Sequence, residues 1–282
     1  MIKYGINTFL WTSPFTTQDL LLLDRARAMG FDLVEIPIEG EQDTDYAKAA
    51  EAFKRTVLEC SVCAIMGASR DPSHEDESIQ RNGVSYLKHC IDAVAQMGGK
   101  KIGGPIYAAV GRTWQATDEQ RKRELERCAK NLKQVARYAE DKGVVLGMEP
   151  LNRFETSFIN IAEQAVELVK MVDSPAIQIM LDSFHMNIEE KSFGKAVELA
   201  GPYLMHIHAN ENDRGIPGSG HVPWNEFAAA LKRINYDGAI VIESFSTTVK
   251  EIARAAAIWR PPAPSPDMLA TEGLAFLKKL MA

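Results

Sequence analysis

Four residues of metal-ligand type occur in succession along the second half of the chain, and each closes a short apolar run. They are Glu149, Asp182, His208 and Glu243. Three carboxylates and one imidazole make a hard, oxygen-rich donor set, which suits manganese, magnesium or cobalt better than a metal that prefers thiolate ligands. Zinc remains an alternative as the bound metal. A single acid at a strand end is usually a solvated loop residue. Four in succession predict one divalent cation per chain.

A second group of polar residues follows the first at short distances. Glu155, His185 and Arg214 come six, three and six positions after members of the first group. A carboxylate, an imidazole and a guanidinium group can each hydrogen-bond to an oxygen-bearing group of a substrate. Arg214 could instead form a surface salt bridge, because the residues around it are polar. We favour a substrate-binding role for all three.

Aromatic residues are the candidates for an apolar wall beside these polar groups. Phe9, Trp11, Trp114 and Phe245 could line the mouth of such a site, and Asn7 is a further candidate for this wall. Aromatic side chains are equally common in protein cores, so each of these assignments is weak on its own.

The remaining histidines have more ordinary interpretations. His206 shares a strand face with His208 but lies one layer deeper, which predicts a hydrogen-bonded core histidine. His221 follows a glycine-rich turn and could line the site mouth or simply pack there, with neither interpretation favoured. His74 and His89 are expected at the surface.

The elements that must position these residues alternate regularly between strand and helix. Apolar runs of strand length alternate with amphipathic runs of helix length, and Thr17 is the expected N-cap of the first helix. The strands are expected at residues 4–10, 31–37, 62–68, 101–106, 144–149, 177–181, 203–209 and 239–244. The helices are expected at residues 17–29, 45–59, 78–97, 118–142, 160–172, 193–200, 224–234 and 267–281.

Eight strand–helix units in 282 residues predict one α/β domain, a single (β/α)8 TIM barrel over residues 1–282. A doubly wound open sheet would also alternate strands and helices, but it normally has a glycine-rich phosphate turn after an early strand, and this sequence has none. The proline-rich run at 260–266 lies too near the C-terminus to separate two domains. Since barrel enzymes carry their active sites at the carboxyl ends of the strands, the four strand-end residues should converge.

The composition of the chain limits the classes of molecule that it can be expected to bind. The chain has 46% hydrophobic and 25% charged residues and a net charge of −6 without a basic stripe, which argues against nucleic acid and membrane partners. No apolar run reaches the length of a membrane helix, and no signal peptide pattern is present, so we expect a cytoplasmic protein. Cys60, Cys63, Cys90 and Cys128 are expected to be inert reduced thiols.

Four sequence runs together resemble the ketose 3-epimerases, which include the D-tagatose and D-psicose (D-allulose) 3-epimerases, among the xylose-isomerase-like barrels. The resemblance extends over nearly the whole chain. The runs are Met-Glu-Pro-Leu-Asn-Arg-Phe-Glu at 148–155, Leu-Asp-Ser-Phe-His-Met-Asn at 181–187, His-Ile-His at 206–208 with Asn-Asp-Arg at 212–214, and Ile-Glu-Ser-Phe at 242–245.

The resemblance implies roles for both groups of residues. Glu149, Asp182, His208 and Glu243 would bind the cation, commonly manganese or cobalt, and Glu155, His185 and Arg214 would hold the first carbons of a ketose. Epimerisation at carbon 3 removes a proton beside a carbonyl and returns it to the opposite face, so two bases are needed. Glu149 and Glu243 are expected to serve as this pair, with the metal stabilising a cis-enediolate.

The substrate and the assembly stay open. Asn7 stands where family members carry an aromatic residue near the far end of the sugar, so D-tagatose, D-fructose, D-psicose and L-ribulose are all candidates. The resemblance also implies a homodimer or homotetramer.

Three alternatives remain. A sugar or hydroxypyruvate isomerase of the same superfamily would use the same metal site to move the carbonyl. An abasic-site endonuclease shares the barrel but would need more histidine ligands, several metals and a basic rim, and the net negative charge speaks against it. A metal-dependent sugar-binding protein is the alternative without catalysis.

Overall fold

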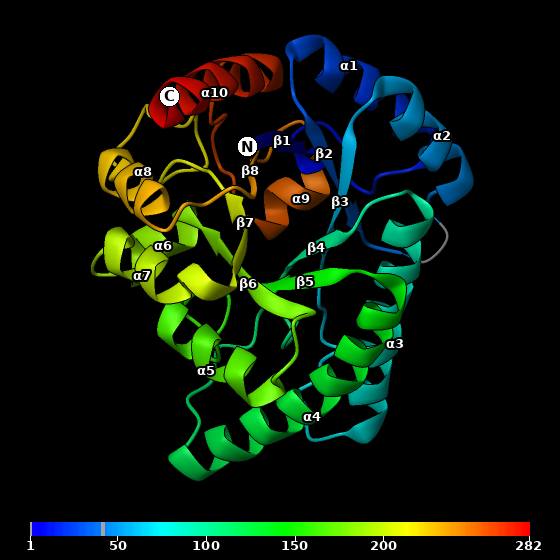
Figure 1. Ribbon diagram of the computed structural model, residues 1–282, viewed down its shortest axis with the longest axis vertical. Coiled ribbons are helices and arrows are strands. Elements are labelled where there is room, and N and C mark those ends of the chain that lie inside the picture. The colour runs from blue at the N-terminus through cyan, green and yellow to red at the C-terminus, as the bar shows by residue number, and fades with distance from the viewer. Residues whose placement is uncertain (1, 41–42) are drawn as a thin grey trace.

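The computed structural model describes residues 2–40 and 43–282. Within these ranges eight parallel strands close into a barrel, in which β1 pairs with both β2 and β8 (Figure 1). The strands are β1 (Lys3–Asn7), β2 (Leu33–Ile38), β3 (Glu59–Ala64), β4 (Lys101–Gly104), β5 (Val145–Met148), β6 (Ile177–Asp182), β7 (Leu204–His208) and β8 (Ala239–Ile242). The predicted (β/α)8 barrel is therefore confirmed.

Helices surround the ring of strands (Figure 1). They are α1 (Leu21–Met29), α2 (Tyr46–Thr56), α3 (Glu77–Gln96), α4 (Asp118–Lys142), α5 (Ala162–Val172), α6 (Ser183–Glu189), α7 (Phe193–Ala200), α8 (Trp224–Arg233), α9 (Lys250–Ala255) and α10 (Pro266–Met281). Three short 3-10 turns, η1 (Thr8–Leu10), η2 (Thr17–Leu20) and η3 (Gly201–Tyr203), complete the elements. None of the helices in the described ranges combines the length and apolar character needed to cross a membrane.

The longest helix, α4, shows how local sequence fixes an element. Thr117 and Gln120 form a reciprocal capping box at its start, and Gly143 ends it in the left-handed conformation at φ 66°. Its bounds match the predicted ones. The last helix, α10, packs on β1 and β8, where the ring closes.

Several predicted boundaries are wrong, and the cause in each case is a local turn. The first strand ends at Asn7 because the Asn7 side chain caps η1 by accepting from the Phe9 amide. The second helix ends at Thr56 because Val57 is left-handed at φ 56°, so β3 starts earlier than predicted. Thr16, and not the predicted Thr17, caps η2, which leads into α1. The short helices α6 and α9 were not predicted.

The lower barrel interior is filled by methionines that face glycines. Met180 and Met205 are buried. A Cβ on Gly103 would lie 2.4 Å from the Met180 sulfur, and a Cβ on Gly147 would lie 2.8 Å from the Met205 sulfur. The two glycines therefore make room for flexible side chains that close the barrel beneath the upper, polar layer.

Candidate active site and metal centre

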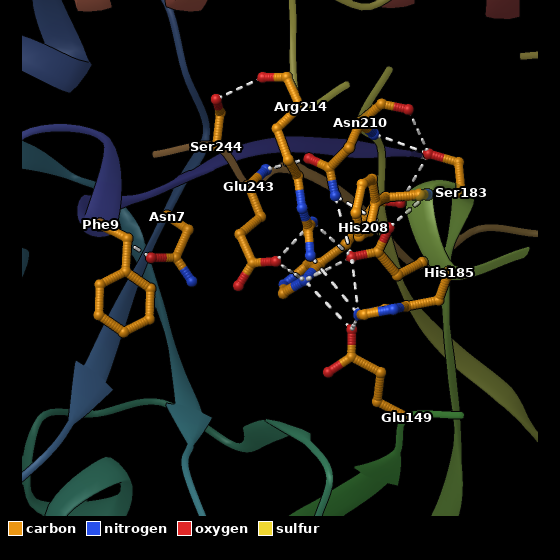
Figure 2. A network of polar contacts seen from close by, with 12 residues as sticks. Asn7, Phe9, Glu149, Ser183, His185, His208, Asn210, Arg214, Glu243 and Ser244 are labelled. Carbon is orange, nitrogen blue, oxygen red and sulfur yellow. Dashed lines mark hydrogen bonds and ion pairs between the residues drawn. The ribbon is translucent and has the colours of Figure 1, made fainter. Parts of the chain in front are cut away.

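The four strand-end residues converge at the carboxyl ends of β5 to β8. Asp182 and His208 are the last residues of β6 and β7 and are paired in register, while Glu149 and Glu243 directly follow β5 and β8. One potential ligand atom from each lies within 4.8 Å of the other three. Figure 2 shows Glu149, His208 and Glu243 turned toward one another. We refer to these four residues as the acidic cluster.

His208 is the centre of this cluster. Its Nδ1 lies 3.3 Å from Oε2 of Glu243, 3.8 Å from Oε1 of Glu149 and 3.9 Å from Oδ2 of Asp182. Burial alone would lower the pKa of His208, but the carboxylates of Glu243 and Glu35 outweigh it and raise this pKa well above its usual value.

The donor set fits a divalent cation. Oε1 of Glu149 and Nδ1 of His208 are buried and have no hydrogen-bond partner among the described residues, although buried polar atoms are normally paired. Burial raises the pKa of Glu149, the Glu243 and Asp182 carboxylates raise it further and His208 lowers it, with a net shift well above the usual value. A cation would satisfy these atoms and relieve the repulsion.

Arg214 supplies a fixed positive charge beside the cluster. Its Nη1 donates to Asp182 at 2.8 Å and to Glu243 at 2.9 Å, and its guanidinium lies over Phe184 at 4.1 Å. Although burial of Asp182 opposes the shift, Arg214, His185 and His208 lower the pKa of this carboxyl to about 2. Because the guanidinium balances one of the three carboxylates of the cluster, two negative charges remain for a divalent cation.

His185 is held as a neutral donor. Its Nδ1 accepts from the backbone N–H of Asn152 at 3.1 Å, so its proton is on Nε2. Nε2 lies 3.9 Å from both Glu149 and Asp182. Burial lowers the pKa of His185, although the Asp182 carboxylate opposes this shift. The ring can therefore donate to an oxygen in the cavity.

The cavity above the cluster has a volume of about 760 Å³, including the part open to solvent. Its polar lining consists of Glu149, Glu155, His185, Arg214 and Glu243, and the rest of the lining is apolar. Of the acidic cluster, Glu149 and Glu243 reach this lining, whereas Asp182 and His208 lie behind it at 1% and 0% exposure. The three predicted substrate-binding residues thus share one cavity with two of the four predicted ligands.

Phe9 and Phe245 line this cavity, but the other proposed wall residues lie elsewhere. The Trp11 indole donates to Asp267 at 3.1 Å, outside the cavity, and Trp114 stacks on Arg112 beside a separate hollow. Asn7 is fully buried and donates to Glu35. These three positions correct the expectation of a wall built from them.

His221 is exposed and does not line the cavity. His206 is buried, as predicted, with Nε2 2.9 Å from Oε2 of Glu35. The geometry is not that of an aligned hydrogen bond, so neither ring nitrogen has such a partner among the described residues. Cys60, Cys63 and Cys128 are buried, and burial raises the pKa of each thiol, which fits inert cysteines.

Three residues that support the site were not identified from the sequence. Asn210 donates to both oxygens of Asp182 at 2.9 Å and accepts from the Glu243 amide. The Asn152 side chain donates to Glu155 at 2.9 Å. Glu35, inside β2, is fully buried next to His208. A charged residue in the apolar run of β2 was the available signal for Glu35; the asparagines gave none.

Comparison with known proteins places this geometry in a family. Residues 23–280 match the sequence profile of the Xylose isomerase-like TIM barrel family. The chain is 34% identical over 278 residues to a probable ketose 3-epimerase of Synechocystis sp., covering 99% of this chain and 96% of the relative. It is 31% identical over 265 residues to the D-psicose 3-epimerase of Agrobacterium fabrum, covering 92% and 90%.

The solved structures agree with the sequence relatives. An L-ribulose 3-epimerase structure superposes with a TM-score of 0.94 at 30% identity, covering 100% of this chain and 95% of the other. The chain therefore belongs to the xylose isomerase-like TIM barrel family and, within it, to the ketose 3-epimerases, which are isomerases.

Proposed function

We propose that this chain epimerises free ketoses at carbon 3, with a divalent cation, manganese first and cobalt or magnesium as alternatives, held by Glu149, Asp182, His208 and Glu243. When bound, such a cation supplies Lewis acidity, which lowers the cost of negative charge on the carbonyl oxygen of the substrate. The relatives named above are a D-psicose 3-epimerase and an L-ribulose 3-epimerase. The substrates to test are therefore these two sugars and D-fructose, the carbon-3 epimer of D-psicose.

The observation that best supports this proposal is that two members of the acidic cluster line the cavity and the other two are buried behind them. Glu149 and Glu243 line the cavity, whereas Asp182 and His208 lie behind them, so of the three carboxylates of the cluster only these two can reach a carbon-bound proton. One glutamate takes the proton from carbon 3 as the electron pair of that bond moves into an enediolate. The other returns a proton to the opposite face, and the roles exchange in the reverse direction.

The remaining polar residues of the cavity orient the substrate. The Nε2–H of His185 and the guanidinium of Arg214 are donors for the oxygens on the first carbons, and the Glu155 carboxylate accepts from a hydroxyl. These interactions keep carbon 3 between the two glutamates. The apolar remainder of the cavity, including Phe9, Phe245 and Ile252, would contact the far carbons of the sugar.

The deciding experiment is conversion of D-fructose to D-psicose after chelation of metal and again after addition of Mn²⁺. We expect turnover to disappear and return, with deuterium from heavy water incorporated at carbon 3 in both sugars. An aldose product without deuterium at carbon 3 would favour an isomerase instead. Binding of ketose without any exchange would contradict a catalytic role.

Assembly as a homodimer or homotetramer and a cytoplasmic location stay predictions. Light scattering after size exclusion would test the assembly, since a dimer or tetramer has two or four times the chain mass of 31.2 kDa.

A further inference from the structure

Glu35 is a fully buried carboxylate in the barrel interior, directly behind the acidic cluster. It stands in register with Asn7 of β1 and Ser61 of β3, so the three residues form a row across adjacent strands. Asn7 donates to Oε1 of Glu35 at 2.9 Å, and Ser61 donates to Oε2 at 3.1 Å. Both contacts require Glu35 to act as an acceptor.

The orientation of the Asn7 side-chain amide is fixed by a second hydrogen bond, at its oxygen atom. Its Oδ1 accepts from the backbone N–H of Phe9 at 2.9 Å, so its Nδ2 must face Glu35. The turn that ends β1 therefore fixes a hydrogen-bond donor on Glu35. Because Phe9 lines the cavity, the same turn also places part of the apolar wall.

His208 reaches Glu35 from the opposite side of the barrel. Its Nε2 lies 2.6 Å from Oε1 of Glu35, a hydrogen-bond distance at which the imidazole must donate because the carboxylate accepts. A ligating imidazole is neutral and carries one proton, so a proton on Nε2 leaves the lone pair on Nδ1. Nδ1 is the atom that faces Glu149, Asp182 and Glu243.

We propose that Glu35 is a positioning residue of the metal centre, which selects the Nε2–H tautomer of His208 and fixes its ring so that Nδ1 is presented to the cation. This inference rests on the proposed metal dependence of the function. Carboxylates that accept from a ligating histidine orient the ring and strengthen it as a donor, and their loss typically lowers metal affinity about 10–100-fold.

A second cation between Glu35, His206 and His208 is the competing interpretation, because these three residues also bring ligand atoms within 4.8 Å of one another. Two observations speak against it. The Glu35 carboxylate already accepts from Asn7 and Ser61 as well as His208, and none of the three residues lines the cavity. A cation there would need to displace hydrogen bonds in a closed interior.

The test compares Glu35→Gln with the unchanged protein by titration of the metal-free chain with Mn²⁺ in a calorimeter. We expect one Mn²⁺ per chain in both, with the dissociation constant about 10–100-fold higher in the variant. Glu124→Gln is the matched control, since Glu124 is also a buried carboxylate but pairs with Arg112 away from the cluster. Its Mn²⁺ affinity should not change.

A second readout separates positioning from general damage. Nitrogen-15 NMR of the histidine rings, with Mg²⁺ as the diamagnetic probe, should show His208 as the Nε2–H tautomer, and this signal should change in Glu35→Gln. If Glu35→Gln does not fold, Ser61→Ala removes one donor to Glu35 at little steric cost and should weaken Mn²⁺ binding several-fold.

The outcomes are distinct. Unchanged affinity in Glu35→Gln, an Nδ1–H tautomer in the unchanged protein, or two Mn²⁺ per chain with one lost in the variant would each overturn the inference and leave the proposed function intact. An unchanged protein that binds no cation would overturn the proposed function, and the inference with it.

Discussion

Glu149 and Glu243 differ from the other two members of the acidic cluster in what they face. Both line the cavity at 4% and 6% exposure, whereas Asp182 is held from three directions. Asp182 accepts from Asn210, Arg214 and the backbone N–H of Phe184, the last as N-cap of α6. Asp182 is thus held in place as a proposed ligand, while the two glutamates face the cavity in which we propose that the substrate binds.

We expect Glu149→Gln and Glu243→Gln each to lower turnover about 10³-fold or more, because each change removes both a ligand and a base. Thermal unfolding of the variants should stay cooperative. The measurement is the epimerisation rate at saturating Mn²⁺, with Glu272→Gln on the exposed face of α10 as control. A near-normal rate in either active-site variant would rule out the two-base scheme.

The raised pKa of Glu149 predicts how metal binding depends on pH. Below this raised pKa the carboxyl holds a proton that a cation must displace, so Mn²⁺ affinity should fall over the pH range in which the pH drops through this pKa. The folded chain also binds this proton more tightly than the unfolded chain. Stability from this group is therefore present at low pH and is lost as pH rises through the raised pKa.

Calorimetry in two buffers with different heats of ionisation checks this pH prediction, because the apparent heat should reveal proton release on Mn²⁺ binding. An affinity that does not change across this range would contradict it.

The residues at the strand ends were predictable because apolar runs of strand length end in polar residues, and parallel strands of a barrel end on the same side. Supporting residues such as Glu35 and Asn210 were not. Glu35 meets His208, 173 positions away, only in the closed barrel, and Asn210 meets Asp182, 28 positions away, only through the pairing of β6 with β7.

At the level of helices and strands, hydrophobic periodicity predicted the alternation of strands and helices well, but it predicted the first and last residues of these elements poorly. The ends at Asn7 and Val57 depend on a side-chain cap and on a left-handed residue without glycine, and neither has a strong sequence signal. The helix α9 was missed because it has only six residues. The missed helix matters for function because Ile252 and Ala255 of α9 line the cavity. Figure 1 shows α9 over the middle of the ring of strands.

For α9 we expect Ile252→Ala to raise KM for ketoses roughly threefold to tenfold with little change in kcat, because it removes apolar contact remote from the reacting carbons. Steady-state kinetics with D-fructose and L-ribulose measure both constants. Arg254→Ala removes an exposed side chain of the same helix that does not line the cavity, and it should have no effect. A lower kcat at unchanged KM would show that α9 acts on the chemical step instead.

Across the entire fold, the number of strand–helix units was enough to predict a closed barrel. The sequence could not predict the cavity, because its walls come from the loops after several different strands. Closure also brings the first strand beside the eighth, which places Phe9 and Phe245 5.7 Å apart at one wall.

Because the cluster draws its members from four strands, a bound cation should stabilise the folded chain as a unit. At about 100 times the dissociation constant, Mn²⁺ adds ~2.7 kcal/mol, which corresponds to a rise of roughly 5–10 °C in Tm. Scanning calorimetry with Mn²⁺ and then with a chelator measures this change. Glu149→Gln should show a much smaller rise, and a full rise in that variant would place the cation elsewhere.

The row of Asn7, Glu35 and Ser61 has a consequence for the order of folding. All four cluster residues lie after residue 148, yet the carboxylate that anchors His208 comes from the second strand. A fragment containing only the later strands would hold every ligand and bind Mn²⁺ weakly. During refolding, tight binding of Mn²⁺ should therefore appear only when the barrel closes. Mn²⁺ binding would then report on closure of the barrel.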